Sequence, residues 1–447
     1  MTINNAHKIL FIGIGGIGMS ALARYFNKKG VEVYGYDKTP SPLTQQLLNE
    51  GIEVFFTDSI QEIKKDTDLV IYTPAIAPSN KVLLEVTSKN IPLYKRAQIL
   101  GQLSKKYKCI AIAGTHGKTS VTSLVSHILH SSGIPILAFI GGITKNYNSN
   151  LIYSENPEYM VVEADEYDRS FLQLYPNISL ITAIAADHLD IYGTEEELHK
   201  AFNDFACRNA ANGSIIVHQK LLTICSADMS YGLHSGSRYF ASQIQIKNHR
   251  YEYKISTPQD ILSTHSTVPG LHNIENSVAA VAIAKTIGIS NKQIIKALES
   301  YTGVKRRFEI VVSNNEHIYI DDYAHHPEEL EACISTVREL YPNSKITGVF
   351  QPHLYSRTRD MAAGFAKSMS LLDQAIVLDI YPAREEPIEN VDSSLIYNLI
   401  TCAEKHMIEK NQLPEWVQQN KPKILITMGA GDIDRLVPQL KEILEKK

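Results

Sequence analysis

The chain has 447 residues, enough for about two to four domains, each with its own hydrophobic core. Hydrophobic residues make up 44% and charged residues 21%, an ordinary globular composition, and the net charge of −4 gives no general attraction to nucleic acid. No apolar run approaches the roughly 18 residues of a transmembrane helix, and residues 1–8 lack a signal-peptide pattern. Five dispersed cysteines lack C-x-x-C spacing. We therefore expect a cytoplasmic protein with no membrane or nucleic-acid partner and no zinc site, whose cysteines are small buried residues.

The first elements predict a nucleotide-binding β-α-β unit. A strand at 8–12 runs into the letters G-I-G-G-I-G at 13–18, and a helix at 19–29 and a strand at 31–36 follow. Glycines in the G-x-G-x-x-G spacing let a pyrophosphate approach the N-terminus of the helix. We expect pyrophosphate contacts from Gly15, Gly16, Ile17 and Gly18, and a ribose contact from Asp37, which follows the second strand.

Alternating strands and helices continue this first region. Strands are predicted at 53–56, 69–72 and 91–94. Thr73, Pro74 and Ala75 follow the second of these directly, so they should lie at the carboxyl edge of the sheet, where ligands bind in such folds. A plain proline turn explains the same residues equally well.

A second phosphate-binding loop is predicted at 110–120, between an apolar strand and a helix that reaches residue 130. Its glycines turn backbone N–H groups inward, its lysine reaches the β- and γ-phosphates, and its threonine hydroxyl suits Mg²⁺. The pattern G-x-x-G-K-T lacks the first glycine of the general motif, because Ile112 stands there. A tight strand-to-helix turn without a ligand is the alternative. The residues with expected ATP contacts are Gly114, Thr115, His116, Gly117, Lys118, Thr119 and Ser120.

Two further strand ends carry groups suited to a metal. A strand at 159–162 ends in E-A-D-E, and we choose Glu163 as the Mg²⁺ ligand because it follows the strand immediately. A solvated acidic turn is the alternative. A strand at 178–184 is followed by His188, for which a metal or catalytic role and a structural role both stay open. The polar stretch at 144–156 is interpreted as a surface loop.

Amide and arginine side chains follow in the next part of the chain. Asn273 and Asn276 lie one turn apart at the start of a helix that reaches residue 287, which suits the donor and acceptor edge of adenine. A helix cap explains an asparagine there equally well. Arg307 belongs to a K-R-R-F run between two α/β regions, where an arginine can close onto a phosphate when domains move. Ordinary surface charge is the alternative for this run.

The last segment predicts a third α/β region with a polar edge. Strands at 318–320, 346–350, 375–380 and 424–428 each end in a polar turn. Pro327 fits the first position of a helix, so His325 lies near a helix N-terminus, whose positive end favours neutral imidazole. The segment 414–422 is interpreted as a linker or loop.

The pattern predicts an α/β protein of three domains: a Rossmann-like N-terminal domain at 1–104, a central P-loop-type ATP-binding domain at 105–302 and a C-terminal doubly wound domain at 303–447. Two phosphate loops predict two phosphorylated ligands, one carrying the substrate and one supplying energy. A dehydrogenase would instead need a hydride-acceptor site, and a sensor would bind ATP without turnover.

The order and spacing of a set of motifs resemble those of the Mur ligases of bacterial peptidoglycan synthesis over essentially the whole length. The motifs occupy residues 13–20, 113–119, 163–166, 187–190, 272–276, 306–308, 322–327, 350–353 and 381–384. In that family the phosphate loop itself lacks the first glycine, which accounts for Ile112.

The resemblance implies an ATP- and Mg²⁺-dependent ligase of cytoplasmic peptidoglycan precursor synthesis, and hence a part in cell-wall biogenesis, cell shape and cell division. The motifs are most similar to those of members that join L-alanine to the lactyl carboxylate of UDP-N-acetylmuramate through an acyl phosphate. A relative that attaches a recycled murein peptide to the same sugar nucleotide is the alternative. We expect a monomer or a weak homodimer.

The resemblance also implies roles for single residues. Lys118, Glu163, His188 and His325 are the catalytic group, and Mg²⁺ is held by Thr119, Glu163 and His188. ATP is contacted by the second loop, His272, Asn273, Asn276 and Arg307, and the UDP substrate by the first loop, Asp37, Thr73, Pro74 and Ala75. The amino acid is contacted by His325, His353, Arg357 and Arg359.

Four positions depart from the family pattern. Leu354 stands where many relatives carry arginine, Ala183 and Ala185 where relatives often have an asparagine and an acid, and Tyr167 where serine is common.

Overall fold

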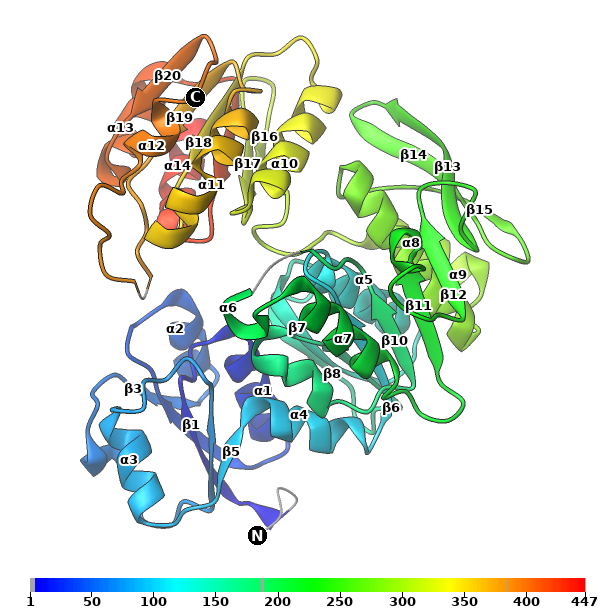
Figure 1. Cartoon of the computed structure of the whole chain (residues 1–447), viewed down its shortest axis with the longest axis vertical. Coiled ribbons are helices and arrows are strands. Elements are labelled where there is room, and N and C mark those ends of the chain that lie inside the picture. Colours follow the sequence, from blue (N-terminus) through cyan, green and yellow to red (C-terminus); the bar gives the residue numbers. More distant parts are fainter. Residues whose placement is uncertain (1–4, 186–188, 384, 447) are drawn as a thin grey trace. The chain divides into compact units, whose positions relative to one another are not determined.

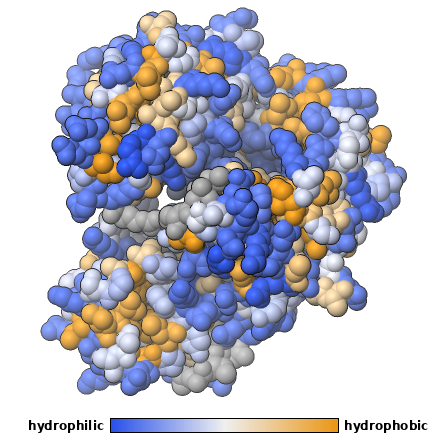
Figure 2. Space-filling view, viewed as in Figure 1, coloured by the Kyte–Doolittle hydropathy of each residue, from blue (hydrophilic) through white to orange (hydrophobic). Residues whose placement is uncertain are grey.

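The computed structural model describes residues 5–185, 189–383 and 385–446, and it is a mixed α/β structure built on three sheets (Figure 1). The chain divides into two compact units. The first contains Met1–Ser242, Lys254–Thr264 and Glu275–Thr302, and the second contains Gln243–Tyr253, His265–Ile274 and Gly303–Lys447. Within the described residues, no helix has both the length and the apolar character needed to cross a membrane. Hydrophilic residues cover most of the face shown in Figure 2.

The N-terminal domain is a five-stranded parallel sheet with the order β3-β2-β1-β4-β5. Its elements are β1 (Lys8–Ile12), α1 (Ile17–Lys28), β2 (Glu32–Tyr36), α2 (Pro42–Asn49), β3 (Glu53–Phe55), β4 (Leu69–Tyr72), α3 (Lys81–Ser88), β5 (Leu93–Lys95) and α4 (Arg96–Ser104). Successive side chains of a strand point to opposite faces, and those of β1 enter two different hydrophobic clusters, Ile9 and Phe11 on one face and Leu10 and Ile12 on the other. Because its two neighbours β2 and β4 lead the sheet in opposite directions, β1 ends at the switch point where such sheets bind ligands.

The central domain repeats this plan around β6. Within the first unit its sheet has the order β12-β11-β10-β6-β9-β7-β8, with β8 antiparallel to β7. The elements here are β6 (Lys108–Ala113), α5 (Lys118–Ser131), β7 (Ile136–Thr144), β8 (Ser149–Tyr153), β9 (Tyr159–Glu163), β10 (Ile178–Ile181), α6 (Leu189–Tyr192), α7 (Glu195–Ala206), β11 (Ser214–His218), β12 (Met229–Gly232), β13 (Tyr239–Lys247), β14 (Arg250–Ser256), β15 (Ile261–His265), α8 (Leu271–Ile287) and α9 (Asn291–Ser300).

The C-terminal domain has a six-stranded sheet with the order β16-β17-β21-β18-β19-β20. Only β16 runs antiparallel to its neighbour among these described strands. The elements are β16 (Glu309–Ser313), β17 (Ile318–Asp322), α10 (Pro327–Leu340), β18 (Ile346–Phe350), α11 (Tyr355–Met369), β19 (Gln374–Val377), α12 (Ser394–Tyr397), β20 (Glu404–Met407), α13 (Leu413–Asn420), β21 (Ile424–Met428) and α14 (Val437–Glu445). Pro327 occupies the first turn of α10, as predicted.

Two predicted loops are wrong. Residues 149–153 form β8, although the stretch is polar, because the fully buried Asn150 finds hydrogen-bond partners inside the protein. The segment 414–422 contains most of α13, in which Pro414 lies in the first turn, where the missing N–H of proline does no harm. Leu413 and Val417 of this helix are fully buried. In both places tertiary contacts outweigh the local polar or proline signal.

The cysteines follow the expectation only in part. Cys109, Cys225 and Cys333 are buried, whereas Cys207 is exposed and Cys402 is partly buried. The prediction of a buried residue is therefore wrong for Cys207.

A buried polar network joins the N-terminal and central domains. Arg24 of α1 is 3% exposed and donates to the side-chain oxygen of Asn150 in β8 and, at 2.7 and 2.8 Å, to the carboxylate of Glu50. The Asn150 amide nitrogen donates back to α1, to the Ile17 carbonyl oxygen at 2.6 Å and the Ser20 hydroxyl at 2.9 Å. Every polar atom of this asparagine side chain is thus used to hold the first turns of α1.

We expect Asn150→Ala to destabilise the protein by about 2–3 kcal/mol, because it removes one acceptor of the buried Arg24 guanidinium and the side-chain donor to the start of α1. Differential scanning calorimetry measures the loss. The matched control is Asn49→Ala, on the exposed end of α2, for which we expect a change of at most about 0.5 kcal/mol. Equal melting temperatures for the two variants would contradict this account of the network.

Candidate active site

The first glycine loop lies at the carboxyl edge of its sheet, between the ends of β2 and β4. The Gly15 N–H donates to one carboxylate oxygen of Asp37 at 2.7 Å. A β-carbon at Gly13, whose φ is +85°, would lie 2.8 Å from the Thr73 methyl group. The predicted edge position of Thr73 is therefore confirmed. The Asp37 carboxylate fixes the backbone of the loop, and its contact with a ribose stays a prediction.

The phosphate loop has the conformation that its sequence predicts. Gly114 has φ +132°, Gly117 has φ +82°, and α5 begins at Lys118. A β-carbon at Gly114 would lie 2.1 Å from the Thr182 hydroxyl oxygen, so only glycine fits there. Both glycines turn the backbone toward the helix N-terminus, which is the arrangement that binds anions.

The segment after β10 holds the loop from one side through hydrogen bonds to its backbone and to one threonine. The Thr182 hydroxyl donates to the His116 carbonyl oxygen at 2.5 Å. The Thr115 N–H donates to the Ala183 carbonyl oxygen at 2.9 Å, and the Ala185 N–H donates to the Thr115 hydroxyl at 3.1 Å. Ala183 and Ala185 therefore support the loop through their main-chain atoms. Their small side chains take no part in these hydrogen bonds.

Lys118 is paired with a carboxylate that sequence reasoning missed. Its ammonium group donates to Glu166 at 2.8 Å and to the Gly114 carbonyl oxygen at 2.5 Å, and the Glu166 side chain is 1% exposed. Burial opposes the charge of Lys118, but the carboxylates of Glu166 and Glu163 outweigh it and raise the pKa of Lys118. The loop thus holds a permanent cation. The acid-rich motif at 163–166 was the available signal for Glu166.

Thr119 and Glu163 form the oxygen donor pair that the sequence predicts for Mg²⁺. The Thr119 hydroxyl donates to one Glu163 oxygen at 3.1 Å, and the Gly141 N–H donates to the other at 3.0 Å. Among the described residues, no cluster of three or more histidines, cysteines and acids could hold a metal by itself. Mg²⁺ commonly takes one or two protein oxygens and completes its shell with water and phosphate, so this pair fits it. His188 lies outside the described residues.

The residues predicted to contact adenine differ in their local partners. The Asn273 amide nitrogen donates to the Pro269 carbonyl oxygen at 2.6 Å and lies 3.0 Å from the His272 ring nitrogen. Asn273 is therefore inside the first turn of α8 and is not its cap. Asn276 lies beside the phosphate loop, since a β-carbon at Gly117 would lie 3.1 Å from its side-chain oxygen.

In the second unit, His325 and His353 lie together at the carboxyl ends of β17 and β18, with ring centroids 6.4 Å apart. Burial, with a smaller contribution from Arg357, lowers the pKa of His325 to about 4. The Nδ1 atom of His325 lies 3.0 Å from the Tyr323 carbonyl oxygen, which can only accept, so Nδ1 carries the proton and Nε2 the lone pair. Burial thus favours the neutral imidazole that the sequence predicts, and it does so more than the helix N-terminus on which that prediction was based.

The arginines of the second unit have separate positions. Arg306 and Arg307 both lie over the Tyr323 ring, and Arg306 also donates to the Gly429 carbonyl oxygen at 2.5 Å and lies 3.4 Å from a carboxylate oxygen of Asp321. Arg357 is half-buried and electrostatically coupled to His325. Arg359 is exposed and paired with Asp360 at 2.7 Å, so the structure does not bring it to the histidines.

Comparison with known proteins covers the whole chain. Residues 8–108, 112–284 and 306–431 match the Mur ligase family catalytic domain, the Mur ligase middle domain and the Mur ligase glutamate ligase domain. The UDP-N-acetylmuramate–L-alanine ligases of Flavobacterium psychrophilum and Flavobacterium johnsoniae are 45% and 42% identical to it, each with 100% of both chains covered. The chain belongs to the Mur ligase family.

Solved structures of Mur ligases agree with this assignment. The crystal structure of the UDP-N-acetylmuramate–alanine ligase of Thermotoga maritima is 28% identical, covers 97% of this chain and 98% of its own, and has a TM-score of 0.86. A murein peptide ligase of Psychrobacter arcticus, 21% identical and covering 99% of both chains, has a TM-score of 0.71 and shares the fold. The predicted three-domain α/β architecture of a Mur ligase is confirmed.

We expect His325 to stay neutral far below its ordinary range, because its buried site disfavours the charged ring. The pKa of His325 is about 4 in the folded protein and about 6.5 in the unfolded chain. The neutral ring therefore contributes to folding stability above about pH 6.5, and this contribution is lost as the pH falls toward 4. An NMR titration of ring-labelled histidine, assigned with His325→Gln, measures the midpoint. Free histidine serves as the reference, because the partly buried His199 lies 3.6 Å from a Glu195 carboxylate oxygen. A midpoint near 6.5 for His325 would contradict the buried site.

Proposed function

We propose that this chain joins L-alanine to the lactyl carboxylate of UDP-N-acetylmuramate and converts ATP to ADP and phosphate. The observation that carries the proposal is full-length identity of 42–45% to several ligases of that name. Two anion-binding loops in one compact unit support it, because this reaction needs one site for a sugar nucleotide and another for ATP.

The chemistry proceeds in two steps. An oxygen of the lactyl carboxylate attacks the γ-phosphorus, ADP leaves, and an acyl phosphate forms. The amine of L-alanine, after it loses a proton, then attacks the acyl carbon and displaces phosphate. Negative charge that develops on the transferring phosphoryl group is stabilised by a preorganised cation, and the charged Lys118 is placed in the phosphate loop to supply it.

Mg²⁺ would be held by Thr119 and Glu163 and would neutralise phosphate charge. His188 is proposed as a further ligand. For the amino-acid end we propose His325, His353 and Arg357. The neutral His325 has its lone pair on Nε2, which can accept a hydrogen bond from the alanine ammonium group.

The remaining assignments of the proposal concern ligands, assembly and location. The first glycine loop, Asp37 and residues 73–75 contact the UDP substrate, and the phosphate loop, Asn276, residues 272–273 and Arg307 contact ATP. The three domains divide at 104/105 and 302/303. The protein acts in the cytoplasm as a monomer or weak homodimer, without nucleic-acid or membrane partners.

We expect phosphate release from ATP only when UDP-N-acetylmuramate, L-alanine and Mg²⁺ are all present. A coupled phosphate assay with L-alanine, glycine, L-serine or the murein tripeptide as acceptor measures it. Release without an amino acid would contradict the proposal, and preference for the tripeptide would favour a recycling ligase. Hydride transfer to NAD would overturn the ligase assignment.

We expect Lys118→Ala to lower kcat by roughly 100- to 1,000-fold or more, because it removes the preorganised cation at the transferring phosphoryl group. Binding of UDP-N-acetylmuramate, measured by calorimetry, should survive because its loop is separate. The matched control is Lys105→Ala, an exposed lysine just before β6. Loss of sugar-nucleotide binding in a folded Lys118→Ala protein would contradict the two-site arrangement.

A further inference from the structure

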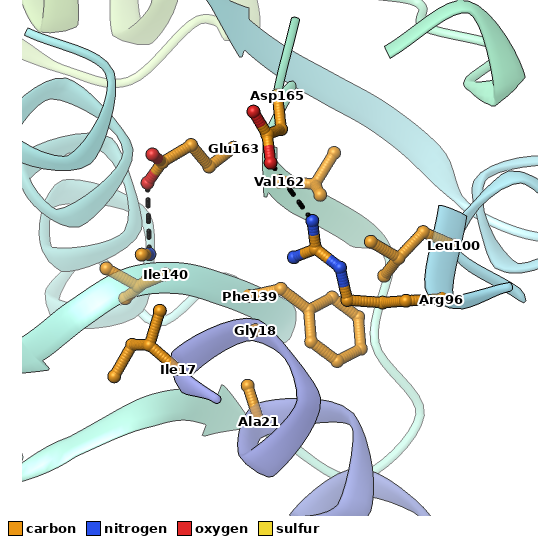
Figure 3. Close-up of a pocket in the computed structure, with 11 residues that line it drawn as sticks. Ile17, Gly18, Ala21, Arg96, Leu100, Phe139, Ile140, Val162, Glu163 and Asp165 are labelled. Carbon is orange, nitrogen blue, oxygen red and sulfur yellow. Dashed lines mark hydrogen bonds and ion pairs between the residues drawn. The ribbon is translucent and has the colours of Figure 1, made fainter. Parts of the chain in front are cut away.

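A pocket of about 110 Å³ lies in the first unit between the helix that follows the glycine loop and the strand ends beside the phosphate loop (Figure 3). One wall is the first turns of α1, including Gly18, and another is β7, whose Phe139 ring lies across the pocket. Glu163 and Asp165, at and just beyond the end of β9, form the polar side. The pocket thus lies between the start of α1 and Glu163, whose carboxylate accepts a hydrogen bond from Thr119 beside the phosphate loop.

Arg96, the first residue of α4, places its guanidinium group in this pocket. One nitrogen donates to Asp165 at 3.2 Å (Figure 3). The other oxygen of Asp165 accepts the Tyr167 N–H at 3.1 Å. A β-carbon at residue 18 would lie 2.0 Å from an Arg96 nitrogen, so the guanidinium occupies the space that any side chain at Gly18 would need. Gly18, the third glycine of the G-x-G-x-x-G pattern, therefore makes room for an arginine from another helix.

The guanidinium keeps donors for a ligand. An arginine has five N–H donors in a planar fork, and within the described chain Asp165 is the one side chain recorded as accepting from Arg96. The Arg96 side chain is 24% exposed, and Ile17, Leu100 and Phe139 supply apolar surface around it. Partial exclusion of water strengthens a charge-assisted hydrogen bond to an anion.

We propose that Arg96 binds and orients the lactyl carboxylate of the sugar nucleotide in this pocket, and the proposal rests on the proposed function. The sugar nucleotide must extend from the glycine loop toward the phosphate loop to place its carboxylate for reaction. The pocket lies between these two parts of the unit. Glu163 and Asp165 would repel an anion there, so a carboxylate ligand requires a cation at the same place. Arginine is suited to this task because its fork matches the two oxygens of a carboxylate.

The pyrophosphate is the other anion that Arg96 could meet. A helix N-terminus suited to the pyrophosphate is supplied by the start of α1, whose residues Ile17 and Gly18 line another wall of the same pocket. Arg96 itself contacts Asp165, which follows Glu163 by two residues. The Glu163 carboxylate in turn accepts a hydrogen bond from Thr119 of the phosphate loop. The geometry therefore favours the end of the substrate that reacts.

The test compares two ligands that differ by the lactyl group, UDP-N-acetylmuramate and UDP-N-acetylglucosamine. Calorimetric titration gives Kd for both with the wild-type protein, Arg96→Met and Arg96→Lys. We expect Arg96→Met to weaken UDP-N-acetylmuramate binding by about 10- to 100-fold and to leave UDP-N-acetylglucosamine binding nearly unchanged. Arg96→Lys should retain part of the preference, because it keeps the charge but loses the fork.

The matched control is Lys95→Met, which removes a neighbouring positive charge that is paired with Asp168 at 2.9 Å and lies outside the pocket lining. Equal weakening of both ligands by Arg96→Met in a folded protein, or no weakening of either, would overturn the inference. If Arg96→Met does not fold, the ratio of the two Kd values in Arg96→Lys decides. A separate measurement tells whether the proposed function itself fails: in that case the wild-type protein releases no phosphate from ATP with UDP-N-acetylmuramate and L-alanine.

Discussion

The packing of α1 against β7 and β8 is the constraint on which the two-loop arrangement depends. The glycine loop precedes α1, so any shift of this helix moves the loop relative to the central sheet. Aromatic contacts between Tyr25 and both Phe139 and Tyr153 supply apolar burial here, but apolar surfaces can slide past one another. The Arg24–Asn150 contact removes that freedom, because a different register would separate the buried Asn150 amide from Arg24 and from the start of α1. Polar groups inside this interface therefore determine its register and also add to its stability.

The short acidic motif at the end of β9 accepts hydrogen bonds from three side chains. Glu163 accepts from Thr119, Asp165 from Arg96 and Glu166 from Lys118. The three acids thus hold side chains from two parts of the chain: Lys118 and Thr119 at the start of α5, and Arg96 at the start of α4. Three carboxylates this close repel one another unless cations or donors lie between them. The same repulsion would favour binding of Mg²⁺ next to Glu163, since Thr119 is its only hydroxyl partner in the described chain.

The sequence predicted best what local backbone chemistry determines. Both glycine loops, the positive φ of Gly114 and Gly117, and the proline at the start of α10 follow from residues that are close in sequence. The buried strand β8 was missed because the partner of Asn150 is Arg24, more than a hundred residues earlier. Arg96 and Glu166 were missed as site residues for the same reason, since only the folded chain pairs them with Asp165 and Lys118. Local patterns predict where a ligand binds, and tertiary pairing determines which charged residues lie at that place.

The turn after β18 contains Leu354, one of the positions that depart from the family pattern. Leu354 has φ +72° and ψ 137°, a conformation that costs a residue other than glycine about 1–3 kcal/mol. Its N–H donates to the Tyr381 carbonyl oxygen at 3.0 Å, and the ring of the preceding His353 stacks on the Tyr381 ring. The strained turn thereby fixes His353 and the start of α11, which carries Arg357. Since leucine cannot bind a carboxylate, recognition of the amino-acid carboxylate falls to Arg357 in the proposed function, and the turn matters because it positions that helix.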